Sequence, residues 1–170
     1  MLNVWKSDIF CFSETWLQPD SIPASYLDIA GYCVDRHDRT LATHGGGLIV
    51  YTINDLRVQR RPNLEHSLIE CTTLELALNH PDGKHLLFFC YRPLNQPPSV
   101  FFNTISELLA LAKNEFATIH LLGDYNAKHR SWDKFSPSNV AGIKFFWAPY
   151  WIFTFLMCRL PDPFLIWWSF

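Results

Sequence analysis

The sequence lacks several features that would assign it quickly to a class of protein. Its net charge of −2 and pI near 6.4 are unlike the strong positive charge that nucleic-acid-binding domains often carry. Its five cysteines form no Cys-x-x-Cys motif, and Cys11, Cys71 and Cys90 lie in apolar runs, which predicts buried thiols in a reducing compartment. No secretory signal follows Met1, so we expect an intracellular protein, nuclear or cytoplasmic, that is not secreted.

Positive charge is present, but only locally. Two clusters contain it: Arg57, Arg60 and Arg61, and further along Lys128, His129 and Arg130. The second cluster could contact a phosphate backbone, and the alternative is a solvated loop. The glycine run at 45–47 has no Lys-Ser/Thr after it, so it is not a phosphate-binding P-loop, and we assign it a backbone role.

The most informative segment is an apolar strand that ends in polar side chains. Residues 118–122 predict a short buried strand, and Gly123 predicts a turn that projects Asp124 and Asn126 from the edge of a sheet. Asp124 could accept a proton from water or align it, and the Asn126 amide could donate to an oxyanion. Gly-Asp-x-Asn is equally common turn chemistry, in which both side chains bond to the backbone, and both interpretations stay open.

A second apolar strand ends in the same way. Residues 9–12 lead into Glu14, a carboxylate of the kind that Mg²⁺ takes together with waters and phosphate oxygens. The alternative is a solvated glutamate at a strand end.

The middle of the chain predicts alternating strands and one helix. We expect strands at 47–52, 68–78 and 85–91, a turn at 79–83, and a helix from 99 to 116 with Ser99 as its N-cap. Tyr91 would emerge at a strand end, followed by Arg92, which is either a phosphate contact or a surface charge. Trp16 and Trp132 could shape a DNA groove, or pack at its rim.

Four ordered motifs carry a resemblance to a known family. They are Ser-Glu-Thr-Trp-Leu at 13–17, Gly-Gly-Gly-Leu-Ile-Val-Tyr at 45–51, Tyr-Arg-Pro at 91–93 and Gly-Asp-Tyr-Asn-Ala-Lys-His at 123–129. Together they resemble the endonuclease/exonuclease/phosphatase superfamily. Within it, the spellings are most similar to the apurinic-type endonuclease domain that precedes the reverse transcriptase in non-LTR retrotransposon polyproteins.

The resemblance implies a DNase I-like α/β fold, a partial four-layer α/β sandwich with mostly antiparallel sheets, over residues 1–142. It implies metal-assisted DNA nicking, in which Glu14 holds Mg²⁺, with Mn²⁺ as an alternative, and Asp124, Asn126 and Tyr91 are the catalytic residues. In retrotransposons the nick primes reverse transcription. DNA is the partner that the family implies, and the sequence indicates no obligate protein partner.

The family's first Asn motif and its terminal Ser-Asp-His motif are absent from the 170 residues, so we expect an incomplete domain. For this chain we therefore favour a catalytically inactive remnant with at most weak nucleic-acid binding over a working nuclease. A phosphoinositide or sphingolipid phosphodiesterase of the same superfamily is a third hypothesis. Residues 143–170 form an aromatic-rich tail outside the family pattern, too interrupted for a membrane span, with a propensity for membrane association or aggregation.

Overall fold

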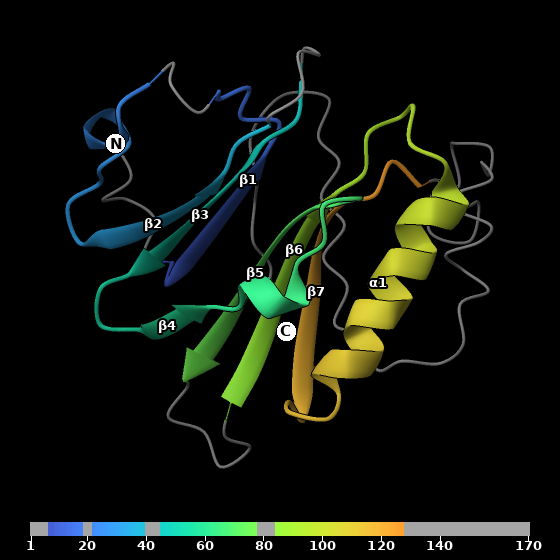
Figure 1. Cartoon of the computed structure of the whole chain (residues 1–170). Coiled ribbons are helices and arrows are strands. Elements are labelled where there is room, and N and C mark those ends of the chain that lie inside the picture. The colour runs from blue at the N-terminus through green and yellow to red at the C-terminus, as the bar shows by residue number, and fades with distance from the viewer. Residues whose placement is uncertain (1–6, 19–21, 40–44, 78–83, 128–170) are drawn as a thin grey trace, which may run out of the picture.

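Figure 1 shows the fold in a computed structural model that describes residues 7–18, 22–39, 45–77 and 84–127. These residues form seven strands, one α-helix and two short 3₁₀ helices. The strands are β1 (Ile9–Ser13), β2 (Tyr32–His37), β3 (Leu48–Ile53), β4 (Arg57–Arg60), β5 (Glu70–Ala77), β6 (Lys84–Tyr91) and β7 (Thr118–Asp124). The helices are α1 (Pro98–Ala112), η2 (Ala24–Tyr26) and η3 (Pro62–Leu64).

The strands make two sheets. The first sheet has the order β1-β3-β2 and the second the order β4-β5-β6-β7. Every pairing is antiparallel except that of β6 with β7, which are parallel and joined through α1. The expected α/β class and the mostly antiparallel sheets are confirmed.

Two apolar layers hold these elements together, because β6 is buried on both of its faces. Its even-numbered residues Leu86, Phe88 and Cys90 pack with α1, and its odd-numbered residues, including Tyr91, pack toward the first sheet. Figure 1 shows the resulting order of helix, second sheet and first sheet. Among the described residues, the segment around η2 packs on the outer face of the first sheet.

The same alternation decides which polar side chains meet. On β7, Leu122 packs between the sheets. Asp124 lies two residues further on and therefore has the same facing. Glu70 on β5 shares the facing of Leu74 and Leu76, which also pack between the sheets. The inter-sheet layer is thus apolar in its middle and acidic at one end.

Most of the predicted elements are confirmed, with three corrections. The predicted cap Ser99 lies inside α1, which begins at Pro98 after Pro97 and ends at Ala112 rather than 116. Gly123 makes no turn: it lies within β7 at φ +145°, where a Cβ would be 1.8 Å from the Cys90 carbonyl oxygen, so the glycine is required by close strand packing. Strands β2 and β4 were not predicted.

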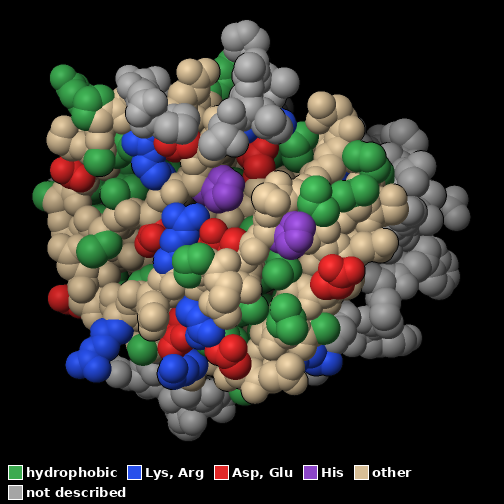
Figure 2. Space-filling model, viewed as in Figure 1, with side chains coloured by type: hydrophobic (Ala, Val, Ile, Leu, Met, Phe, Trp, Pro, Cys, Tyr) green, Lys and Arg blue, Asp and Glu red, His purple; other side chains and the backbone are tan. Residues whose placement is uncertain are grey.

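The basic cluster predicted at Arg57, Arg60 and Arg61 is also corrected. Arg60 pairs with Glu65 at 2.9 Å, and Arg61 pairs with Glu75 at 2.7 Å. Figure 2 shows acidic and basic side chains next to one another, rather than one basic patch, on the face of the molecule that is turned to the viewer. Partners on neighbouring segments therefore neutralise most of the charge that the sequence brings together.

The predicted turn at 79–83 and the tail at 143–170 lie outside the described residues. Among the described residues, no helix has the length and apolar character needed to cross a membrane.

Candidate active site

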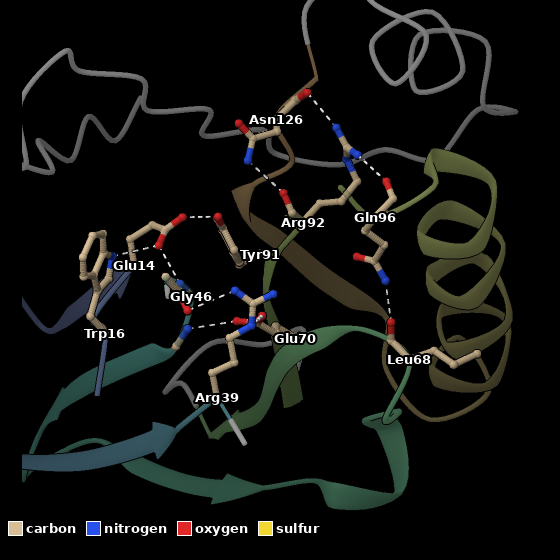
Figure 3. A network of polar contacts seen from close by, with 12 residues as sticks. Glu14, Trp16, Arg39, Gly46, Leu68, Glu70, Tyr91, Arg92, Gln96 and Asn126 are labelled. Carbon is tan, nitrogen blue, oxygen red and sulfur yellow. Dashed lines mark hydrogen bonds and ion pairs between the residues drawn. The ribbon is translucent and has the colours of Figure 1, made fainter. Parts of the chain in front are cut away.

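Four of the predicted site residues lie at the same end of the two sheets. Residue Ser13, just before Glu14, pairs with Leu48 at the start of β3. Tyr91, at the end of β6, pairs with Asp124, at the end of β7. Figure 3 shows Glu14 and Tyr91 pointing toward each other from the two sheets.

Glu14 is held by three hydrogen bonds to its carboxylate. Its Oε2 accepts hydrogen bonds from the Gly46 backbone N–H at 2.6 Å and from the Trp16 indole Nε1 at 3.0 Å. Its Oε1 accepts one from the Tyr91 hydroxyl. The backbone of Glu14 has φ +58°, an uncommon conformation for a residue with a long side chain. Its carboxylate is thus fixed by donors from three separate segments.

The glycine run at 45–47 provides part of this support. The three residues have φ values of +95°, +82° and +86°, a succession of left-handed conformations that favours glycine. Gly46 donates to Glu14, and Gly47 donates to Glu70 Oε2 at 2.9 Å. The glycine run therefore presents two backbone N–H groups to two carboxylates, those of Glu14 and Glu70.

Tyr91 is almost fully buried, at 5% exposure, and connects the two sheets through its hydroxyl. Burial raises the pKa of Tyr91, and the carboxylates of Glu14, Asp124 and Glu70 raise it further. The hydroxyl consequently stays protonated and donates to Glu14. The contact that the structure shows for Tyr91 is with Glu14, the expected metal ligand. The role of Tyr91 in orienting a phosphate stays a prediction.

The Asp124–Asn126 segment has the turn geometry that the sequence left open. Asp124 Oδ1 accepts a hydrogen bond from the Asn126 backbone N–H at 2.9 Å, and Asn126 has φ +46°. The Asn126 side-chain Nδ2 donates to the Arg92 carbonyl at 2.8 Å. The turn therefore ties the end of β7 to the end of β6 and holds both polar side chains at the site's edge.

Arg92 is neither a phosphate contact nor a surface charge, because only 3% of it is exposed. Its guanidinium donates to the carbonyl oxygens of Tyr125 at 2.6 Å, Gln96 at 2.7 Å and Asn126 at 2.8 Å. Burial lowers the pKa of Arg92, and the Asp124 carboxylate opposes that change. The arginine thus fastens the Asn126 turn to the loop that follows β6 (Figure 3).

Sequence reasoning missed Glu70, which pairs with Tyr91 across the β5–β6 hairpin. Glu70 Oε1 forms an ion pair with Arg39 Nε at 3.0 Å, and Arg39 also donates to the Gly45 carbonyl at 3.0 Å. Period-two alternation along β5 would have found this residue, since Glu70 has the facing of Leu74 and Leu76.

The three predicted phosphate contacts, Lys128, His129 and Arg130, lie outside the described residues, as does Trp132. Their contribution to the site stays a prediction.

Comparison with known proteins gives the fold of this arrangement. No family model and no curated protein matches the sequence. Solved structures do match: the endonuclease domain of TRAS1, a telomere-specific non-LTR retrotransposon, has a TM-score of 0.63 at 16% identity over 85% of this chain. The AP endonuclease LMAP from Leishmania major has a TM-score of 0.60 at 21% identity over 84% of this chain. The catalytic domain of human Nocturnin has a TM-score of 0.53 at 13% identity over 75% of this chain.

The chain has the fold of the endonuclease/exonuclease/phosphatase superfamily. It spans 58% of the TRAS1 domain, 53% of the Leishmania enzyme and 54% of Nocturnin. The TM-scores of 0.53–0.63 show that the fold is shared despite identities of 13–21%.

The divalent cation that this superfamily fold implies can be tested against the donors at Glu14. A carboxylate has about four acceptor positions, and among the described residues Glu14 uses two on Oε2 and one on Oε1. One position on Oε1 is left for a single hard-metal contact. No group of three or more His, Cys, Asp or Glu side chains suited to a metal occurs among the described residues. The remaining Oε1 position of Glu14 therefore leaves room for one contact to a hard cation such as Mg²⁺, which proteins often hold through one or two carboxylates.

Proposed function

We propose that this chain carries part of the active site of a divalent-metal-dependent phosphodiesterase that cleaves DNA, of the kind found in non-LTR retrotransposon endonuclease domains. One observation supports it above the others. The Tyr91 hydroxyl reaches across the two sheets to Glu14, while Asp124 lies beside Tyr91 at the end of the neighbouring parallel strand. A carboxylate for a metal and a carboxylate for a water are thereby presented at one edge of the molecule.

The proposed reaction divides the chemistry among four side chains. Glu14 would hold Mg²⁺, or Mn²⁺ in its place, through its remaining Oε1 position, and the cation would supply positive charge next to the phosphate oxygens. Asp124 aligns the attacking water and accepts its proton as the phosphorus–oxygen bond to the leaving strand end breaks, and the leaving oxygen takes a proton from solvent. Asn126 donates to the developing negative charge on the phosphate. Tyr91 keeps Glu14 in place through its protonated hydroxyl and positions the phosphate.

A plasmid-nicking assay of the full chain tests the proposal. Wild-type protein is expected to convert supercoiled DNA to the nicked form with Mg²⁺ and not with EDTA, and Glu14→Gln is expected to lose at least about 10²-fold in rate. Glu107→Gln, on the exposed side of α1, is the matched control and should retain the wild-type rate. Nicking that survives in Glu14→Gln, or in EDTA, would contradict the assignment of Glu14.

A catalytically inactive domain with at most weak nucleic-acid binding is the second candidate. The observation in its favour is that Glu14 already accepts three hydrogen bonds, which fill most of the acceptor positions of its carboxylate without an ion. Absence of nicking by folded wild-type protein would select it. Turnover of a phosphoinositide or sphingolipid headgroup instead of DNA would select the lipid phosphodiesterase. For each of these candidate functions we propose that the protein acts inside the cell.

A further inference from the structure

Trp16 is a large aromatic side chain that remains 65% exposed beside the proposed active site. Tryptophan is usually well buried, because its ring removes a large apolar area from water when it packs. Figure 3 shows the Trp16 ring next to the Glu14 carboxylate. This exposure sets Trp16 apart from the aromatic residues of β1 and β3, which pack against the outer face of the first sheet.

The exposed ring is nevertheless held in one orientation. The Trp16 backbone has φ +58°, a conformation that is strained for such a residue and persists only when surrounding contacts impose it. Those contacts are the Trp16 N–H donating to the Gly46 carbonyl at 2.9 Å and the indole Nε1 donating to Glu14 Oε2 at 3.0 Å. The polar edge of the indole is thus turned to the protein, and its flat faces are left in solvent.

We propose that Trp16 is a stacking platform for an unpaired nucleobase of the substrate strand, adjacent to the phosphate at Glu14. The inference rests on the proposed function for the place of that phosphate and goes beyond it by naming the substrate feature that is recognised. Nε1 lies within hydrogen-bond distance of the proposed metal ligand. A base attached to a nucleotide whose phosphate lies at Glu14 is therefore within reach of the indole.

The surroundings of the ring favour a nucleobase over a membrane or an apolar protein surface. Either of those occupants would cover the ring together with Glu14 and strip water from a carboxylate, which is costly without new partners. A stacked base covers only a face of the indole and leaves the carboxylate edge open to water and cations. Aromatic side chains that stack on bases are the usual means of binding single strands without sequence preference.

Fluorescence anisotropy with a labelled single-stranded 12-mer and the matching duplex, in EDTA so that nothing is cleaved, tests the inference on the full chain. Trp16→Ala is expected to weaken single-strand binding by about 5- to 150-fold, the fold-change that corresponds to stacking of one base. Trp16→Phe keeps an aromatic face and should lose less. Tyr26→Ala removes another aromatic side chain, 81% exposed on η2, and should change nothing.

Three results would overturn the inference: no single-strand binding by wild-type protein, unchanged affinity in Trp16→Ala, or an equal loss for single strand and duplex. If Trp16→Ala fails to fold, Trp16→Phe, the more conservative change, takes its place: its smaller loss of affinity must still be greater for the single strand than for the duplex. The outcome is separable from that of the proposed function. Trp16-dependent single-strand binding without any Mg²⁺-dependent nicking would support the inference and contradict the catalytic proposal, and nicking with Trp16-independent binding would do the reverse.

Discussion

Replacing Arg92 with methionine should cost the fold about 3–5 kcal/mol, the range found when one partner of a buried charged interaction is removed. The guanidinium donates to three carbonyl oxygens at 2.6–2.8 Å, on Tyr125, Gln96 and Asn126. Methionine has a similar length and no donor, so each of these oxygens loses a charged partner, at roughly 1–3 kcal/mol where water cannot replace it. Removing the buried charge itself recovers desolvation energy, which keeps the total below the sum of the three losses.

Urea unfolding followed by circular dichroism measures this cost. With a slope of roughly 2 kcal/mol per molar urea, the midpoint should fall by about 1.5–2.5 M. Arg57→Met is the matched control: it removes an exposed arginine at the start of β4 and should change the stability by less than about 0.5 kcal/mol. A midpoint for Arg92→Met within experimental error of wild type would refute the role of Arg92 as the fastener of the Asn126 turn.

Two further predictions concern acidic residues. Glu70→Gln keeps an acceptor for the Gly47 N–H but removes the negative charge that pairs with Arg39. The affinity for Mn²⁺, measured by calorimetry, should fall by about 10- to 100-fold, the usual cost of changing a residue that supports a metal ligand. An unchanged affinity would show that Glu70 does not support the metal site. The pKa of Glu75 is lowered from 4.5, first by the Lys84 ammonium, so its stabilising contribution is present above pH 4.5 and is lost as the pH falls through the lowered value. Glu75→Gln should therefore flatten the decline of the urea midpoint below about pH 4.5, and an equally steep decline would contradict this.

The positions of Glu14, Tyr91 and Asp124 could be predicted because each comes at or just after the end of a run of apolar residues. Runs of this kind in neighbouring strands end at common edges, so a reader of the sequence can place such residues together without knowing the packing. The helix before β7 could also be predicted from a local pattern, because its apolar residues recur at helical spacing. These signals are local, and each needs only ten to fifteen residues of sequence.

Arg92 and Gly123 were misread because their roles depend on distant partners. Arg92 is buried by carbonyl groups more than thirty residues away as well as by its own loop. Gly123 is required by the close approach of the Cys90 backbone on the adjacent strand. No window along the chain contains both members of either contact. Strands β2 and β4 escaped prediction for another reason, since neither strand has a buried side chain and both lack a clear apolar run.

Backbone conformation separates the residues whose placement local rules explain from those that need another reason. Asn126 is at φ +46°, but asparagine enters this region readily and the Asp124 turn accounts for it. Glu14 and Trp16 are both at φ +58°, and residue type does not explain their conformation, because neither glutamate nor tryptophan favours the left-handed region. Glycine would relieve the strain at both positions. The carboxylate and the indole are fixed to each other at 3.0 Å in these strained positions. Because strained residues cluster at functional sites, Glu14 and Trp16 carry a stronger structural argument for function than the Gly-Asp-Tyr-Asn motif does.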